Sequence, residues 1–485
     1  MPAEPTQLVP HFRCDLQAGS EPLPHFWEHT VGSCHATLAL RADWQAQLAR
    51  ARRELGFRHV RFHGILDDDM GTLVCQDEQL LYSFFNTDRI MDFLLSIGMR
   101  PFIELSFMPA TLSSGADTVF RYRGNITPPR DLGAWATLVS RLVGHWIERY
   151  GVEEVRLWFF EVWNEPNLHQ FFTGSQADYF AFYEATARAI KGRDADLRVG
   201  GPATAANAWV PQFLDFCEAH AVPVDFVSTH HYPTDNFGQP GDDTEAQLAA
   251  SPRSVLREQA RTVREQARGR ALYYTEWSSS SNARDPLHDE SYAASFIVKT
   301  VLEARGLVQG YSYWTFSDIF EESYFPSVPF HGGFGLLNLY GIAKPAYRAF
   351  ELLHGIGTEI LPLSGTHPTV DCWVVRSASC VSVLLTNYVQ PRHAIRAERV
   401  RVTLSRCAAM SATLQRIDAA HTNPKRRWLE MGSPEYLSPE QVAVLQAASV
   451  CLSTPLPLNV EASGVSFEVV LPELSAACVQ LQLSP

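Results

Sequence analysis

Two short motifs contain glutamates that could take part in acid–base catalysis. FEVWNEPN, residues 160–167, closes an apolar run that begins VRLWFF, and YYTEWS, residues 273–278, closes another. Hydrolysis of a glycosidic bond needs two carboxyl groups at one cavity, because one protonates the leaving oxygen and the other stabilises or attacks the oxocarbenium-like centre. The motifs therefore indicate Glu165 and Glu276 as a catalytic pair.

The neighbours of Glu165 suggest how the first motif works. Pro166 biases the preceding residue toward an extended backbone, and so is expected to hold Glu165 at the mouth of a strand. Asn164 can donate a hydrogen bond to a sugar 2-hydroxyl, an interaction that strengthens in the transition state. Glu161 lies deeper in the strand, and we interpret it as a buried carboxylate held by a partner.

The elements that must position these residues alternate along the chain. Between about residues 30 and 354, short β-rich runs are separated by stretches with apolar residues at helical spacing. The β-rich runs are TVGSCH, HVRFHG, PFIELSF, LWFFEVWNEP, RVGGPAT, FVSTHHYP, LYYTEWS and YSYWTFSD. They predict an α/β fold, a (β/α)8 TIM barrel with insertions after the third and eighth strands, rather than a doubly wound sheet, because no glycine-rich nucleotide turn follows any strand.

In such a barrel the site lies at the carboxyl ends of the strands, and polar residues gather there. Further candidates at these ends are Arg61, His63, His230, His231, Tyr232, Trp314, Glu321 and Glu322. Arg61 would keep a nearby Glu276 ionised. Trp314 is a candidate stacking platform for a sugar, whereas Trp163 is expected to be packing. His230 and His231 have no third donor in a known ligand motif, so no metal site is predicted.

The pattern changes after the last helix. Residues beyond 354 alternate apolar and polar side chains, as in ERVRVTLS and VSFEVVLPELSAACVQLQL, which predicts a C-terminal antiparallel β-sandwich domain. The expected division is a barrel at 14–354 and a sandwich at 355–485, which residues 1–13 could also join. LSPEQVAVLQAAS predicts a short helix inside the sandwich, and the absence of a low-complexity linker indicates that the domains pack together.

The motifs together resemble glycoside hydrolase family 39 of clan A, the β-xylosidase and α-L-iduronidase family. FEVWNEPN and YYTEWS carry the resemblance, supported by RFHG, THHYP and YWTFSDIFEE in the same order. The resemblance implies that Glu165 is the acid/base, Glu276 the nucleophile and Asn164 the partner of the 2-hydroxyl. It also implies a sugar pocket formed by His63, Phe171, His230, Tyr232, Trp314, Glu321 and Glu322.

The predicted function is that of a retaining, exo-acting β-D-xylosidase, without metal or organic cofactor, that releases xylose from xylo-oligosaccharides. An α-L-arabinosidase, a β-glucosidase, an α-L-iduronidase or a non-catalytic carbohydrate-binding barrel are the alternatives. The formal charge of −13 without a basic face argues against a nucleic-acid or membrane partner and favours a neutral glycoside. The start lacks a signal-like pattern and nine cysteines show no CxxC spacing, so a cytoplasmic protein with free thiols is expected; the oligomeric state stays open.

Overall fold

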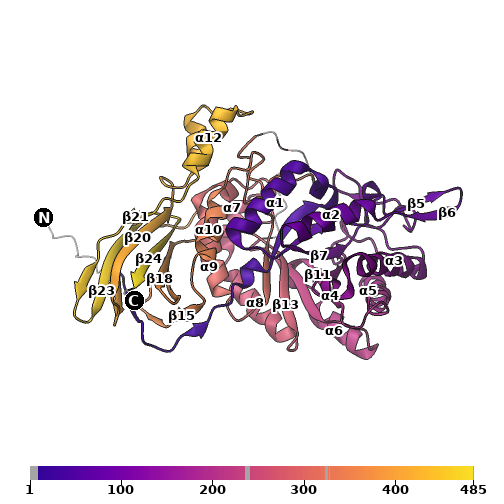
Figure 1. The fold of residues 1–485 in the computed structure, drawn as a ribbon, viewed down its shortest axis with the longest axis horizontal. Helices are drawn as coiled ribbons and strands as arrows, with labels where there is room; N and C mark the ends of the chain where they lie inside the picture. The colour runs from indigo at the N-terminus through magenta and orange to yellow at the C-terminus, as the bar shows by residue number, and fades with distance from the viewer. Residues whose placement is uncertain (1–8, 235–240, 323–325, 327, 484–485) are drawn as a thin grey trace.

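Eight parallel strands close into a barrel in the order in which they occur in the chain (Figure 1). The computed structural model describes residues 9–234, 241–322, 326 and 328–483. The barrel strands are β3 (Thr30–His35), β4 (His59–His63), β7 (Arg100–Leu105), β10 (Phe159–Val162), β11 (Arg198–Thr204), β12 (Phe226–His231), β13 (Ala271–Trp277) and β14 (Gly310–Tyr313). Each falls on a run predicted from the sequence, so the (β/α)8 fold is confirmed.

Helices surround the barrel, and several begin and end at sequence signals. They are α1 (Ala42–Leu55), α2 (Phe85–Ser96), α3 (Leu132–Tyr150), α4 (Val152–Val155), α5 (Gln176–Lys191), α6 (Val210–Ala219), α7 (Thr244–Ala250), α8 (Val255–Gln266), α9 (Ser291–Glu303) and α10 (Pro345–His354). Asp131 caps α3 by accepting from two backbone N–H groups, and Ser175 with Asp178 forms a capping box at α5. Gly56 ends α1 with a φ of 77°, a left-handed conformation that glycine adopts without strain.

The C-terminal domain is a sandwich of a five-stranded and a seven-stranded sheet. The first sheet contains β16 (Leu363–Ser364), β1 (His11–Asp15), β19 (Glu398–Ser405), β23 (Gly464–Leu471) and β22 (Asn459–Glu461). The second contains β2 (Glu21–Pro22), β15 (Glu359–Leu361), β17 (Val370–Arg376), β18 (Cys380–Asn387), β24 (Ser475–Leu483), β20 (Ala409–Ile417) and β21 (Thr454–Pro455). Their inner faces enclose a separate apolar core.

The first strands that the structure describes belong to this sandwich up to residue 22, farther along the chain than expected. β1 pairs in parallel with β19, and β2 pairs with β15, so the chain enters the barrel only after residue 22. The predicted barrel start at residue 14 is therefore too early. The pairing partners lie more than 300 residues away, and local alternation in the sequence does not reveal them.

Insertions decorate the carboxyl side of the barrel. The predicted insertion after the third strand contains β8 (Thr118–Val119) and β9 (Gly124–Asn125), and the one after the eighth strand separates β14 from α10. A hairpin of β5 (Leu73–Gln76) and β6 (Gln79–Tyr82) was not predicted; it projects at the end of the molecule opposite the sandwich (Figure 1). The predicted helix in the sandwich is α12 (Pro439–Ala448), preceded by α11 (Pro424–Glu430).

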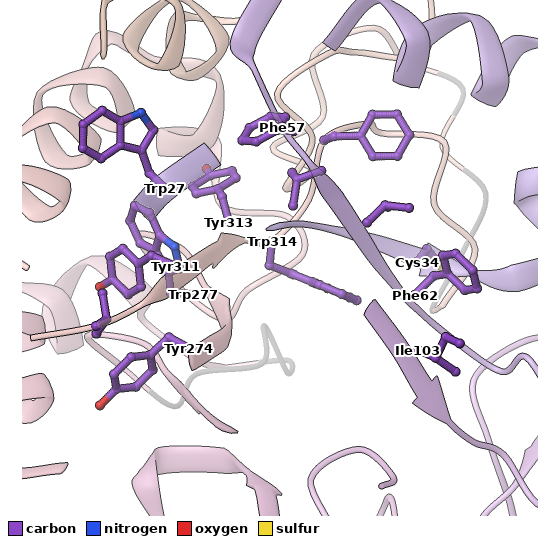
Figure 2. Packing of buried hydrophobic residues seen from close by; sticks show 14 of the residues in the cluster. Trp27, Cys34, Phe57, Phe62, Ile103, Tyr274, Trp277, Tyr311, Tyr313 and Trp314 are labelled. Atoms are coloured by element: carbon purple, nitrogen blue, oxygen red, sulfur yellow. The ribbon is translucent and has the colours of Figure 1, made fainter. Parts of the chain in front are cut away.

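The barrel interior below the site is filled by aromatic rings. Phe102, Phe159 and Phe226 form a buried cluster, in which the first two rings are parallel with centroids 5.0 Å apart. Between strands and helices, Trp277 stacks on Tyr311 at 4.2 Å, and Figure 2 shows these two rings side by side. Such packing makes the barrel a solid support rather than a channel.

The apolar cluster of the barrel continues across the junction onto the outer face of the sandwich. Tyr388 of the sandwich packs against Tyr292 and Phe296 of α9, with ring centroids 5.5 Å and 6.0 Å apart. Arg253 crosses the junction, donating to the carbonyl of Tyr388 and to both carboxylate oxygens of Asp371. The two domains are thus packed together rather than tethered.

Deleting residues 355–485 is therefore expected to leave little soluble protein. The deletion would strip α9 of its cover and expose rings that are now 1–3% accessible, at a cost of about 25 cal/mol for each Å² of apolar surface. Soluble yield after centrifugation and thermal unfolding would measure the effect. A truncated barrel that is soluble and fully active would contradict it.

No helix in the described ranges is both long and apolar enough to span a bilayer. All nine cysteines lie within the described ranges and none is in a disulfide. Cys75, in the β5–β6 hairpin, is exposed, whereas most of the others are buried.

Candidate active site

Glu165 and Glu276 meet at the carboxyl ends of β10 and β13. Their side chains are almost fully buried, and both contact the same nitrogen of His230: Nδ1 lies 2.8 Å from Oε1 of Glu165 and 3.1 Å from Oε2 of Glu276. An oxygen of each carboxyl group therefore lies within 4.8 Å of the other. The two glutamates singled out by the sequence thus share one site.

The backbone of Glu165 differs from the extended conformation expected before Pro166. Its φ is 45°, in the left-handed region, and Trp163 also has a positive φ of 70°. The Glu165 N–H donates to the carbonyl of Ala203 at the end of β11, and its own carbonyl accepts from Leu168 N–H. These tertiary and turn hydrogen bonds outweigh the local preference set by proline.

Arg61 lies beneath the pair and holds three carboxylates. Its Nε donates to Glu161 at 2.6 Å, Nη2 lies 2.8 Å from Glu104, and Nη1 lies 3.3 Å from Glu276. Glu161 is thus a buried carboxylate with a partner, as the sequence indicated. Glu104 was missed, although an ionisable residue inside the apolar run PFIELSF signals a buried ion pair.

Arg61 also orients the amide of Asn164. Nη2 donates to Oδ1 of Asn164 at 3.0 Å. A guanidinium has no acceptor, so the oxygen of the amide must face it and the NH₂ group is left for the pocket. That orientation suits donation to a sugar hydroxyl.

The environment lowers the pKa of Glu276. Burial alone would raise this pKa, but the charge and hydrogen bond of His230, together with the charges of Arg61 and His63, lower it to about 2. Glu276 is therefore an anion at neutral pH.

Glu165 experiences the opposite balance. Burial raises its pKa and the Glu276 charge adds to the effect, while His230 opposes both. Two carboxyl groups at one site with pKa values pushed apart are the arrangement that supplies an anion and an acid at the same pH.

His63 contributes a further positive charge near Glu276. Burial would lower its pKa, but the charge and hydrogen bond of Glu104 and the contact with Glu322 raise it to about 10. Its Nδ1 lies 2.7 Å from Glu104, and its Nε2 lies 3.4 Å from Glu322 and 3.7 Å from Glu276. The His63 imidazolium thus lies between Glu104, beneath the site, and Glu322, at the side of the pocket.

A pocket of about 530 Å³ opens above these groups. Its lining residues are His63, Val119, Phe120, Asn164, Glu165, Gln170, Phe171, Tyr232, Glu276, Ser281, Ala283, Trp314, Glu322 and Phe334. Trp314 lies across β3 because Gly32 has no side chain: a Cβ there would lie 2.6 Å from the indole ring. The Tyr232 hydroxyl lies 3.4 Å from Oε2 of Glu276.

Three of the candidate site residues, Arg61, His230 and Glu321, do not line the pocket. Arg61 and His230 are completely buried beneath it, where Arg61 lies against Glu276, as expected, and His230 contacts both Glu165 and Glu276. Glu321 points elsewhere, with a carboxylate oxygen 3.8 Å from Arg41. Glu321 and Glu322 are consecutive residues of the loop after β14, and their side chains point in different directions. Only Glu322 of these two lines the pocket. Trp163 is packing, as predicted: its indole N–H donates to the carbonyl of Phe171.

The loop after β14 is fixed from below by a buried lysine. Lys344 is inaccessible to solvent, and its Nζ lies 2.6 Å from Asp318 and 2.8 Å from Asp289. These carboxylates accept from the backbone N–H groups of Gly335 and Gly332, on either side of Phe334. The ion pairs thereby hold Phe334 at the pocket and were not foreseen from the sequence.

Histidine-containing clusters could in principle hold a cation. The described residues bring three donors within 4.8 Å at His25, Glu28 and His354, at His35, Asp67 and Asp69, and at Glu165, His230 and Glu276. In the last group, Arg61 already lies 3.3 Å from Glu276 and would repel a cation. His231 stays outside the pocket: its Nε2 lies 2.8 Å from the Tyr311 hydroxyl.

A (β/α)8 barrel with two glutamates at the ends of its fourth and seventh strands, one with a raised and one with a lowered pKa, is the architecture of a glycoside hydrolase. The sequence model of glycosyl hydrolases family 39 matches residues 11–463, and this chain belongs to that family. It is therefore a glycosidase, and the resemblance inferred from the motifs is confirmed.

Several known proteins are similar to this chain over most of its length. A β-xylosidase from Caldicellulosiruptor saccharolyticus is 50% identical over 430 residues, covering 87% of this chain and 88% of that protein. A β-xylosidase from Geobacillus stearothermophilus is 37% identical over 444 residues, covering 89% of this chain and 87% of that protein. The crystal structure of a monomeric β-xylosidase from Caulobacter crescentus CB15 is 36% identical, with a TM-score of 0.88, and covers 98% of this chain and 100% of that one.

Proposed function

We propose that the protein is a retaining β-D-xylosidase that removes xylose from the non-reducing end of short xylo-oligosaccharides. The observation that carries this proposal is the contact of both Glu165 and Glu276 with one nitrogen of His230. Such closeness favours direct attack by a carboxylate, for which carboxyl carbons about 5–5.5 Å apart are typical, over attack by an intervening water.

Catalysis then follows in two displacements. The Glu276 carboxylate attacks the anomeric carbon and forms a covalent ester, while Glu165 gives its proton to the departing sugar oxygen. Glu165, now a carboxylate, accepts a proton from water as that water attacks the ester and releases xylose with its β configuration. The amide NH₂ of Asn164 donates to the 2-hydroxyl, because Arg61 holds the amide oxygen.

The pocket favours a neutral sugar. Its lining residues within the described ranges include Glu322 besides the two proposed catalytic glutamates but no lysine or arginine. The imidazolium among them, His63, already contacts Glu104 and Glu322. A uronic acid would need a cation for its carboxylate. The aromatic walls formed by Trp314, Phe171 and Phe120 supply apolar faces for the C–H surfaces of a sugar. Similarity to the two bacterial β-xylosidases supports xylose as that sugar.

A panel of aryl glycosides tests the proposal directly. We expect the aryl β-xyloside to have the highest kcat/KM, above the α-arabinoside and β-glucoside, and the α-iduronide to be inert. Methanolysis followed by NMR should give methyl β-xyloside, the product of two inversions. Preference for another sugar would overturn the assignment of xylose, and a methyl α-xyloside would overturn double displacement.

A further inference from the structure

A chain of buried hydrogen bonds links Arg61 to the proposed acid Glu165 through Thr275. Arg61 Nε donates to one oxygen of Glu161, and the Thr275 hydroxyl donates to the other at 2.7 Å. The same hydroxyl oxygen lies 3.1 Å from Nε2 of His230, whose Nδ1 lies 2.8 Å from Oε1 of Glu165. Thr275 is 1% exposed and His230 is fully buried, so these groups depend on one another for partners.

The direction of each hydrogen bond follows from the chemistry of its partners. Arg61 can only donate, so Glu161, which is ion-paired with it, accepts at both carboxylate oxygens. A hydroxyl has a single proton, and Thr275 gives that proton to Glu161. The hydroxyl oxygen can therefore only accept from His230, and Nε2 of this histidine must carry a hydrogen.

With Nε2 protonated, exactly one further proton can occupy the contact between His230 and Glu165. Either Glu165 donates it to a neutral imidazole, or an imidazolium donates it to the Glu165 carboxylate. Removal of this proton would leave the lone pair of Nδ1 facing oxygens of Glu165 and Glu276 at 2.8 Å and 3.1 Å. In a buried site that repulsion is costly.

We infer that Thr275 is a positioning residue for the acid step: by fixing the hydrogen on Nε2 of His230, it makes the Glu165–His230 pair retain the proton that Glu165 delivers to the leaving group. The inference rests on the proposed function and adds a residue that does not touch the substrate. It treats the proton as a property of the pair rather than of Glu165 alone.

The groups around His230 agree with this assignment. Glu165 and Glu276 face Nδ1, and the Arg61 charge lies nearby on β4. Burial would lower the pKa of His230, but the Glu276 charge and the hydrogen bonds to both glutamates raise it to about 9. On the same strand, His231 is bonded to Tyr311, and burial holds its pKa well below the usual value.

Thr275→Val tests the inference, because valine keeps the shape of threonine and removes its hydroxyl. The neutral imidazole can then place its hydrogen on Nδ1 and donate it to the carboxylates, while an imidazolium leaves its Nε2–H without an acceptor. Both effects favour loss of the acid proton. The basic limb of the kcat/KM profile with xylobiose should therefore fall by about one pH unit or more, whereas Thr275→Ser, the matched control, should keep the wild-type limb.

A second variant changes the other partner of the Thr275 hydroxyl, Glu161. In Glu161→Gln the amide oxygen faces Arg61 and the NH₂ group faces Thr275, so the hydroxyl turns its proton toward Nε2 of His230. The basic limb should again fall. The folding of each variant is checked by its thermal unfolding midpoint, and a folding defect alone would lower activity at every pH without moving the limb.

The leaving group separates this role from a general loss of activity. With a dinitrophenyl xyloside the first step needs no acid, so its rate in Thr275→Val should show no shifted basic limb. An unmoved or raised limb with xylobiose in both Thr275→Val and Glu161→Gln, or an equal fall in Thr275→Ser, would overturn the inference. Failure of the wild type to hydrolyse any β-xyloside would instead overturn the proposed sugar. The pH profiles would then be recorded with an aryl glycoside and an unactivated disaccharide of the sugar that the protein does hydrolyse.

Discussion

Glu276→Ala is expected to lower kcat with every glycoside substrate by roughly 10⁴-fold or more, because it removes the group that forms the covalent ester. The carboxylate lies at the floor of the pocket, and Arg61, His63 and His230 keep it anionic. No neighbouring group can replace it from the same position: Glu161 is bound to Arg61, and Glu104 is bound to Arg61 and His63. The loss should be equally severe with activated and natural substrates.

Azide identifies the position of the missing group. In Glu276→Ala a small anion can occupy the vacated space and displace the leaving group once, so an aryl β-xyloside should yield α-xylosyl azide. The matched control is Glu321→Gln, on the loop after β14, whose carboxylate lies near Arg41 and outside the pocket. It should retain activity close to wild type. Activity of Glu276→Ala within a hundredfold of wild type would mean that Glu276 is not the nucleophile.

Glu165→Ala is expected to divide substrates by their leaving group. Hydrolysis of xylobiose should fall by about 10²–10⁴-fold, the usual contribution of a general acid, because the departing sugar hydroxyl requires a proton. With a dinitrophenyl xyloside the first displacement should survive. The second should slow, since no base activates water, and the glycosyl-enzyme should accumulate as a burst of dinitrophenolate.

Azide distinguishes Glu165 from Glu276 by the anomer that it produces. In Glu165→Ala azide attacks the glycosyl-enzyme, needs no deprotonation, and should restore turnover with β-xylosyl azide as product, the opposite anomer to that from Glu276→Ala. The basic limb of the kcat/KM profile with xylobiose, which the raised pKa of Glu165 produces in the wild type, should also be absent from the residual activity of the variant. Equal loss of both substrates, without rescue by azide, would show that another residue is the acid/base.

The barrel could be predicted because its signals are local. Each barrel strand is a short β-rich run bounded by turns, and the alternation with helices defines the parallel connection. The β5–β6 hairpin was missed because its residues are largely exposed, so burial does not impose a clear alternating pattern on them. β1 and β2 were assigned incompletely for another reason: their partners are far away in the sequence.

The site was predicted unevenly. Glu165, Glu276, Asn164, His63, Phe171, Tyr232, Trp314 and Glu322 all line the pocket. The residues beneath them were harder to foresee. Glu104, Thr275 and Lys344 occur within or beside ordinary strand and loop patterns. Their roles become visible only from the side chains that they contact in the folded protein, which are Arg61, Glu161 and Asp318.

By itself, the sequence determined which residue types stand at the ends of which strands, and therefore a barrel with two facing glutamates, because strand period and strand order are local properties. The resemblance implied different roles for those glutamates, but only the tertiary structure shows the physical cause of the difference. Both are glutamates and both are buried to a similar degree, so neither residue type nor burial separates their pKa values. The pKa of Glu276 is lowered because Arg61 and His63 on β4 and His230 on β12 lie close to its carboxylate. A pKa depends on distances of a few ångströms between groups brought together by folding, and no spacing along the chain encodes those distances.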